Sequence, residues 1–245
     1  MIVNAGSFIL KPGYQLMAFG IMPGMTGILV TCNRNKESMC VKEMYKLLGE
    51  YDGFKEDNEG SLNKVDGEEI EDALLREVAE LKDRKNKPFL SIGLGKGTGC
   101  LVFIKLASEY DPVEVAVGLL TNQANNNITL KSTQRLLPMQ AICYANLVDF
   151  TKMVKQVLKE RLIDKLSTGP RTFSILIEKR MNDSLSKPVI IQAVGDILSG
   201  TPNLSVDLKR SDTVIMVQVL RNICGISVID GYYGADLNKM NIHLK

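Results

Sequence analysis

Apolar and polar residues along the first part of the chain are arranged as expected for a strand followed by two helices. Residues 26–32 (TGILVTC) are a short β-prone apolar run, and a polar turn comes directly after them. The next apolar positions are spaced i, i+4, i+7 and i+8: Cys40, Met44, Leu47 and Leu48. This spacing predicts one face of a helix that ends near residues 49–53. Residues 66–83 predict a second helix, with apolar residues on one side and acids on the other.

The middle of the chain predicts a pair of strands, a helix and a further strand. Two β-prone runs, residues 88–94 and 100–106, are joined by a glycine-rich segment. A helix over residues 111–121 begins with a capping aspartate and a proline, and residues 128–137 predict the next strand. The order strand, helix, strand pair, helix, strand is that of a ferredoxin-like domain, here with an acidic helical insert.

A second unit is predicted from about residue 146 onward. Lysines and an arginine occupy one side of its first helix. The apolar stripe on the other side consists of Phe150, Val154, Val157, Leu158 and Leu162. The other predicted elements are a strand at residues 172–178, a helix at 187–198, and strands at 205–209, 213–220 and 226–229. The run 213–220 is almost continuously apolar, which predicts a central strand buried on both faces.

These elements predict an α+β protein in which an N-terminal ferredoxin-like domain precedes a second domain. The boundaries that we expect are an N-terminal extension at residues 1–24, the ferredoxin-like domain at 25–140 with the acidic insert at about 52–83, the second domain at 141–232, and a C-terminal tail at 233–245.

Composition and charge narrow the class of partner. With 45% hydrophobic and 24% charged residues, the 245-residue chain is typical of globular proteins, and it contains no apolar run long enough to span a bilayer. The net charge of +2 conceals an asymmetry, because residues 52–83 hold 12 acidic and 4 basic residues. Residues 131–245 hold 16 basic and 10 acidic residues. This distribution favours a polyanionic partner over a small neutral substrate.

The residue types exclude several kinds of catalytic site. The chain has one histidine, His243, and five cysteines of which no pair has the spacing of metal ligands. The cysteines are predicted to be reduced core residues of an intracellular protein: Cys32, Cys40, Cys100, Cys143 and Cys224. We therefore expect no metal site, no cofactor and no catalytic residue.

The glycine-rich segment at residues 93–99 (GLGKGTG) superficially resembles a phosphate-binding loop. Such loops open a helix, whereas the residues that follow here are β-formers. A hairpin arm with Lys96 at its tip, able to touch RNA backbone, is therefore favoured over a nucleotide site.

The sequence before the predicted helix at residue 187 suits phosphate binding better. Arg180, Asn182, Ser184 and Ser186 lead into Lys187 and Pro188, where backbone N–H groups and the positive end of the helix dipole point outward. The alternative is an ordinary serine-capped helix with scattered surface charges.

Four stretches, at residues 27–51, 132–143, 172–183 and 206–230, resemble the tRNA acetyltransferase adaptor family, in which a THUMP domain follows a ferredoxin-like domain. The stretch around CGISV, residues 224–228, is the most specific. The resemblance implies a non-catalytic protein that binds tRNA, whose acceptor-stem end THUMP domains recognise. It implies a separate ATP- and acetyl-CoA-dependent RNA cytidine acetyltransferase as partner, forming N4-acetylcytidine in the D-arm of serine and leucine tRNAs. Basic positions that match the family pattern are Arg135, Lys179 or Arg180, and Arg221.

The predicted function is therefore a tRNA-binding adaptor with no membrane partner, located in the nucleus or nucleolus, with the cytoplasm as the alternative. The predicted RNA-binding residues are Lys96, Arg135, Lys152, Lys155, Lys159, Arg171, Lys179, Arg180, Asn182, Lys187 and Arg221. Three alternatives stay open: a THUMP subunit for another tRNA-modifying enzyme, a nucleotide-dependent enzyme that uses the 93–99 loop, and a purely structural interaction protein.

Overall fold

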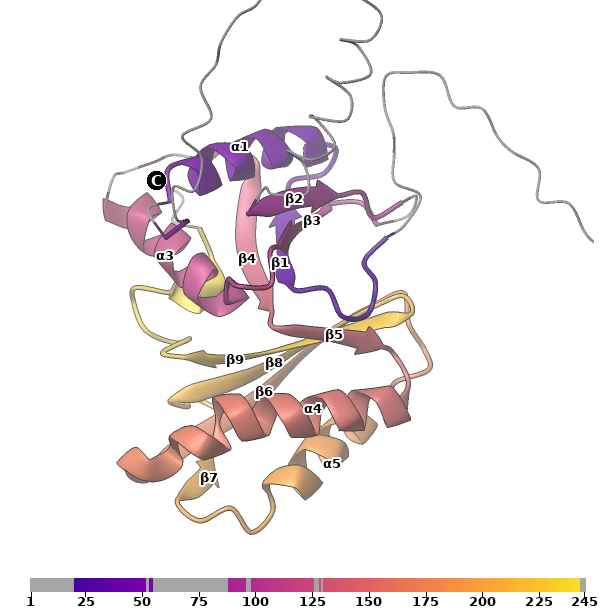
Figure 1. The fold of residues 1–245 in the computed structure, drawn as a ribbon, viewed down its shortest axis with the longest axis vertical. Coiled ribbons are helices and arrows are strands. Elements are labelled where there is room, and N and C mark those ends of the chain that lie inside the picture. The colour runs from indigo at the N-terminus through magenta and orange to yellow at the C-terminus, as the bar shows by residue number, and fades with distance from the viewer. Residues whose placement is uncertain are drawn as a thin grey trace, which may run out of the picture.

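The protein contains two β-sheets, one above the other in Figure 1, with helices on both. The structure is a computed structural model, and it describes residues 20–51, 53–54, 88–95, 98–125, 128 and 130–242. The helix predicted at residues 66–83 lies outside the described residues.

The first sheet has the ferredoxin-like topology that the element order predicts. Its elements are β1 (Gly27–Cys32), α1 (Glu37–Gly49), β2 (Phe89–Ile92), β3 (Leu101–Leu106), α3 (Pro112–Asn125) and β4 (Thr133–Met139). The strands are ordered β2-β3-β1-β4 and every neighbouring pair is antiparallel. The buried residues of α1 are the four predicted from their spacing.

The second sheet has five strands in the order β5-β9-β8-β6-β7. Its elements are β5 (Ala141–Tyr144), α4 (Leu147–Arg161), β6 (Arg171–Arg180), α5 (Lys187–Leu198), β7 (Leu204–Val206), β8 (Thr213–Leu220) and β9 (Ile223–Asp230). A 3-10 helix, η1 (Ile163–Thr168), connects α4 to β6, and a second, η2 (Asn238–Met240), follows β9. The mixed α+β class is confirmed.

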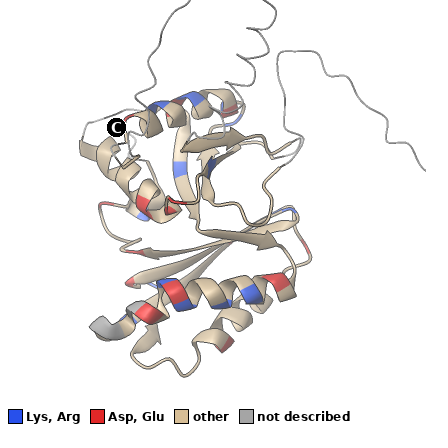
Figure 2. Cartoon of the chain, viewed as in Figure 1, with Lys and Arg blue, Asp and Glu red and all other residues tan. Residues whose placement is uncertain are grey.

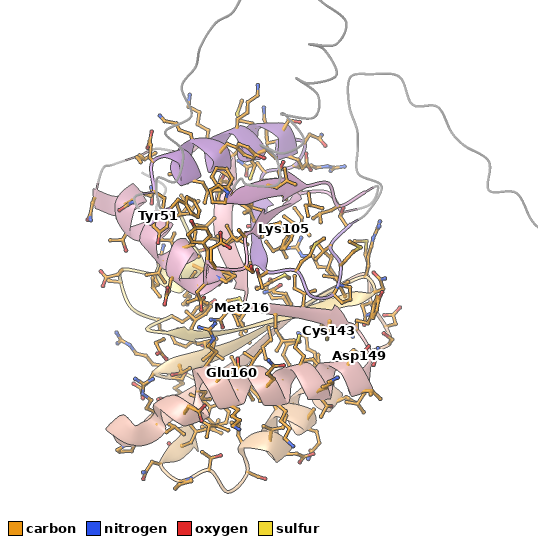
Figure 3. The ribbon with its side chains drawn as sticks, viewed as in Figure 1. Tyr51, Lys105, Cys143, Asp149, Glu160 and Met216 are labelled. Atoms are coloured by element: carbon orange, nitrogen blue, oxygen red, sulfur yellow. The ribbon has the colours of Figure 1, made fainter. Side chains whose placement is uncertain are left out.

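The five-stranded sheet is covered on both faces, as the apolar run in β8 predicts. Helices α4 and α5 cover one face, where Ile215, Val217 and Val219 of β8 belong to their core. Alternate residues of the same strand, Val214 and Met216 among them, point the other way and join the core of the first unit. Met216 is fully buried between the two units (Figure 3). One apolar core is thus shared by both sheets.

Side chains and the last described segment also connect the units. The guanidinium of Arg161 on α4 forms an ion pair with Asp111, which precedes α3. The segment after β9 returns to β4, where the backbone N–H of Ile242 donates to the carbonyl of Gln134 at 2.8 Å. Ile242 is buried in the core of the first unit, although residues 233–245 were expected to be a tail. The division into two domains remains a prediction.

Several predicted strand boundaries were wrong. The strand expected at residues 128–137 begins at Thr133, and that expected at 205–209 ends at Val206. The short strand expected at 226–229 runs over eight residues, Ile223–Asp230, because it pairs along the whole of β8. Strand β5 was not predicted, because its four residues gain their strand partners only from β9, far along the chain.

Candidate nucleic-acid interface

One end of the five-stranded sheet gathers four of the predicted RNA-binding residues. Arg180 ends β6, Asn182 follows it, Lys187 begins α5, and Arg221 occupies the turn between β8 and β9. Backbone hydrogen bonds hold these segments together, since the N–H of Arg221 donates to the carbonyl of Arg180 at 3.0 Å. Arg180, Lys187 and Arg221 are exposed.

Asn182 has a positioning role in this arrangement. Its amide Nδ2 donates to the carbonyl oxygen of Arg221 at 2.6 Å, and its Oδ1 accepts the N–H of Leu185 at 3.0 Å. Ser184 next to it donates its hydroxyl to the carbonyl of Ala145 at 2.9 Å. Asn182 therefore fixes the turn that carries Arg180 against the turn that carries Arg221.

The start of α5 keeps the features of an anion-binding helix end. Ser186 occupies the N-cap position, but its side chain makes no capping hydrogen bond, and the first turn contains no acidic residue. The positive end of the helix dipole is therefore not neutralised by a carboxylate of its own first turn. Exposed Lys187 adds a positive charge at the same place.

Helix α4 presents three of the predicted lysines, Lys152, Lys155 and Lys159, on its exposed side. Its apolar stripe packs on the sheet, which leaves these side chains facing outward. Figure 2 shows acidic residues on the same helix, so its charge is mixed. The lysines extend the basic character of the turns along the helix.

The other predicted residues are placed differently. Arg135 is half-buried and forms an ion pair with Glu178 at 2.7 Å, and Arg171, at the far end of β6 from Arg180, pairs with Asp230 at 3.3 Å. Lys179, the second-last residue of β6, is half-buried. Lys96 lies outside the described residues. Arg135 and Arg171 thus have carboxylate partners within the protein, and the structure assigns them to intramolecular contacts.

The glycine-rich segment at residues 93–99 connects two antiparallel strands, β2 and β3. A phosphate-binding loop of the kind weighed from the sequence opens a helix, whereas the described residues after this segment form β3, as the hairpin interpretation predicts. The segment lies beside the sheet end, since a Cβ placed on Gly95 would be 3.7 Å from Nη1 of Arg221.

Tyr144, which the sequence analysis missed, separates two hollows at this end of the molecule. The first, of about 450 Å³, is lined by Arg221, Asn222 and Gly95 among others. The second, of about 520 Å³, is lined by Lys152 and Asp149 together with the segment before β1. Tyr144 lines both hollows and is 52% exposed. An exposed aromatic ring between two hollows that hold Arg221 and Lys152 is suited to stacking with an unpaired base.

A pair of thiols lies across strands β5 and β9. Cys143 on β5 stands opposite Cys224 on β9, and the hydrogen bond between them lowers the pKa of Cys143 and raises that of Cys224. Among the described residues no group of three or more His, Cys, Asp or Glu side chains could hold a metal ion, and no helix is both long and apolar enough to cross a membrane.

This end of the sheet lies within a recognisable domain. The family model of the THUMP domain matches residues 144–229. Residues 144–229 are similar to the THUMP domain family. The match begins at Tyr144, the residue between the two hollows, and it includes Arg180, Asn182, Lys187 and Arg221. Arg135 and Lys96 lie before it.

Similarity extends beyond the THUMP domain to most of the chain. THUMP domain-containing protein 1 of Mus musculus is 26% identical in an alignment 227 residues long that covers 86% of this chain and 62% of the mouse protein. The tRNA acetyltransferase TAN1 of Saccharomyces cerevisiae is 26% identical in an alignment 243 residues long that covers 90% of this chain and 84% of the yeast protein. The chain thus spans less than two thirds of its mouse relative's length.

The crystal structure of PH1313 from Pyrococcus horikoshii superposes with a TM-score of 0.49 at 14% sequence identity, covering 85% of this chain and 56% of that protein.

Proposed function

We propose that this protein is a non-catalytic adaptor that binds tRNA through its THUMP domain and presents it to a separate RNA cytidine acetyltransferase. The product would be N4-acetylcytidine in the D-arm, and serine and leucine tRNAs are the proposed substrates. The observation that carries the RNA-binding part is the gathering of Arg180, Lys187 and Arg221 at one end of the five-stranded sheet, where Arg221 and Tyr144 line a hollow. The yeast relative's name, tRNA acetyltransferase TAN1, supports the choice of reaction.

The interface suits a nucleic acid whose phosphates and unpaired bases are bound together. Lys152 and Arg221 line different hollows, so each supplies a positive charge beside the aromatic ring. Phosphate contacts would fix the position of the tRNA, and stacking on Tyr144 would favour unpaired over paired nucleotides. An acceptor-stem end offers both features.

Charge reversal tests the RNA-binding part of the proposal. The double variant Arg180→Glu with Lys187→Glu should bind tRNA at least about tenfold more weakly, with a shallower salt dependence, because phosphate contacts are lost. Binding is measured by fluorescence anisotropy at several salt concentrations, and an unchanged unfolding midpoint shows that the fold is retained. The same number of charges is reversed at Lys209 and Arg210 in a matched control, which should bind normally. Parent-like affinity in the first variant would contradict this interface.

Reconstitution tests the adaptor role. The purified protein with tRNA, ATP and acetyl-CoA should form no N4-acetylcytidine, and adding an RNA cytidine acetyltransferase should produce it. Acetylation by the protein alone would make it an enzyme.

Mass spectrometry of tRNA nucleosides from cells that lack the protein tests the biological reaction. N4-acetylcytidine should disappear and should return with the parent protein but not with the charge-reversal variant. An unchanged N4-acetylcytidine level with loss of a different modified nucleoside would instead assign the protein to another tRNA-modifying enzyme.

A further inference from the structure

Helix α1 exposes a row of basic residues at a distance from the THUMP domain. Arg34 and Lys36 precede or start the helix, Lys42 and Lys46 lie one turn apart along it, and Lys131 comes from the segment before β4. All five are exposed. We refer to these five residues as the α1 basic surface. The sequence analysis predicted none of them to bind RNA. The helix also contains glutamates, so a charge count along the sequence shows no excess of basic residues there.

The acidic side chains within α1, those of Glu37 and Glu43, accept hydrogen bonds from backbone N–H groups of neighbouring segments. The carboxylate of Glu37 accepts the backbone N–H of Cys100 at 2.7 Å. The carboxylate of Glu43 accepts the backbone N–H groups of Lys131 and Thr133 at 2.8 and 2.9 Å. The exposed side of the helix is therefore more basic than the sequence of the helix suggests.

The basic residues of this surface have few partners of their own. The ion pair between Lys46 and Glu50 is 4.0 Å long and its side chains are 69% and 50% exposed, so it contributes little. Within the part of the chain that the structure describes, Arg34, Lys36 and Lys42 have no carboxylate within ion-pair distance. Among the described residues, their charges are not compensated by ion pairs.

Helix α1, above the four-stranded sheet, and helix α4, below the five-stranded sheet, lie on opposite sides of the molecule (Figure 1). A ligand that contacts both must extend past the four-stranded sheet and the five-stranded sheet in turn. A folded tRNA is large enough to do so, whereas an oligonucleotide of a few residues bound in the hollows is not.

We propose that the α1 basic surface binds backbone phosphates of the same tRNA at a second place, outside the hollows beside Tyr144. This inference rests on the proposed function, because it takes tRNA as the ligand of the THUMP domain. Phosphate contacts carry no sequence information, but they fix the orientation of a bound nucleic acid. The second contact would set the direction in which the body of the tRNA leaves the protein.

Two ligands and three variants test the proposal. The ligands are folded tRNA and a single-stranded oligoribonucleotide of about six nucleotides, which is within the site size of small single-strand binding folds. The variants are Lys36→Glu with Lys42→Glu on α1, Tyr144→Ala in the hollows, and the matched reversal of Lys209 and Arg210. The exposed positions on α1 should tolerate the change, which thermal unfolding checks.

The α1 double variant should bind tRNA about tenfold more weakly while binding the oligoribonucleotide as the parent does. Its log–log salt slope should be smaller by roughly 1.4 to 1.8, the value for two lost phosphate contacts. Tyr144→Ala should weaken both ligands, and the matched control neither. Adding a charge by Ser38→Lys, on the exposed side of α1, should strengthen tRNA binding, and this variant stands in if the reversal fails to fold.

Three outcomes would overturn the inference. The α1 variant could bind tRNA as tightly as the parent, or the matched control could lose as much affinity, which would reduce the effect to net charge. If the α1 variant bound tRNA normally but no longer bound the RNA cytidine acetyltransferase, the surface would be an interface with that protein. In each case the tRNA affinities of the parent and of Tyr144→Ala still show whether the hollows bind RNA. A parent protein that binds no tRNA would contradict the proposed function itself.

Discussion

A single carboxylate determines where β4 begins. The side chain of Glu43 on α1 accepts the backbone N–H groups of Lys131, Ser132 and Thr133, with the hydroxyl of Thr133 as a further donor at 2.7 Å. These residues precede or start the strand, so their N–H groups are satisfied by a helix instead of a neighbouring strand. The strand predicted from residue 128 therefore starts at Thr133.

The Glu43 interaction predicts a pH dependence of stability. Burial raises the pKa of Glu43, but the hydrogen bonds that its carboxylate accepts outweigh burial and hold the pKa below its usual value. A depressed pKa in the folded state gives stability that is present above the unfolded pKa of about 4.3 and is lost as the pH falls through the lower folded value. Glu43→Gln should therefore lower the free energy of unfolding by about 1–3 kcal/mol at neutral pH and by less near pH 3. Urea unfolding of both proteins at several pH values measures the difference, and a constant difference would contradict this account.

Arg135 provides a second prediction at the residue scale, because it matches the family pattern and yet lies in an internal contact. Its guanidinium pairs with Glu178 and donates to the hydroxyl of Tyr232 at 3.2 Å. Arg135→Met leaves the half-buried carboxylate of Glu178 without its partner, so we expect a loss of about 2–4 kcal/mol in unfolding free energy. Glu178→Gln in addition should recover part of that loss. Folded Arg135→Met should retain parent affinity for tRNA, and a large drop would return Arg135 to the RNA-binding residues.

Helix α4 depends on its cap at the end that faces the hollows. The side-chain oxygen of Asn146 accepts the backbone N–H of Asp149 at 2.9 Å. Asn146→Ala should cost about 1 kcal/mol of unfolding free energy, whereas Asn146→Ser, which can accept the same bond, should cost little. Chemical denaturation measures both variants. Equal stability of the two would mean that the bond contributes nothing.

Elements with a strong period of their own could be predicted from the sequence. The buried residues of α1, the bounds of α5 and the double-sided burial of β8 follow from local spacing alone. Elements defined by distant partners could not. β7 stops early because Asp207 accepts the N–H groups of Lys209 and Arg210 and turns the chain away from the sheet.

At the candidate interface too, only residues that are close together in the sequence could be predicted. Arg180 and Lys187 could be found because they are close in sequence and precede a helix with the residue types of an anion site. Tyr144 could not, since its surroundings come from the segment before β1, the β2–β3 connection and the β8–β9 turn. The only local signal was a tyrosine at the end of a short apolar run, which is common in buried strands as well.

The shared core makes the two sheets one cooperative structure at the scale of the whole molecule. Met216 on β8 is fully buried and belongs to the core that includes α1 and β1. Met216→Ala should lower the unfolding free energy by about 2–5 kcal/mol. Hydrogen exchange should show the loss of protection in both sheets, and the exposed Ile191→Ala on α5 serves as a control with little effect. Loss of protection confined to the five-stranded sheet would show that the units unfold independently.

The return of the segment after β9 to β4 has a consequence for the order of events during synthesis. Leu237, Met240 and Ile242 belong to the same buried core as residues of β1, α1 and α3, which are synthesised much earlier. Domains generally fold from the N-terminus as they leave the ribosome. Here the N-terminal sheet cannot complete its core until residue 242 has emerged, so a nascent chain stalled before that point exposes apolar surface to chaperones.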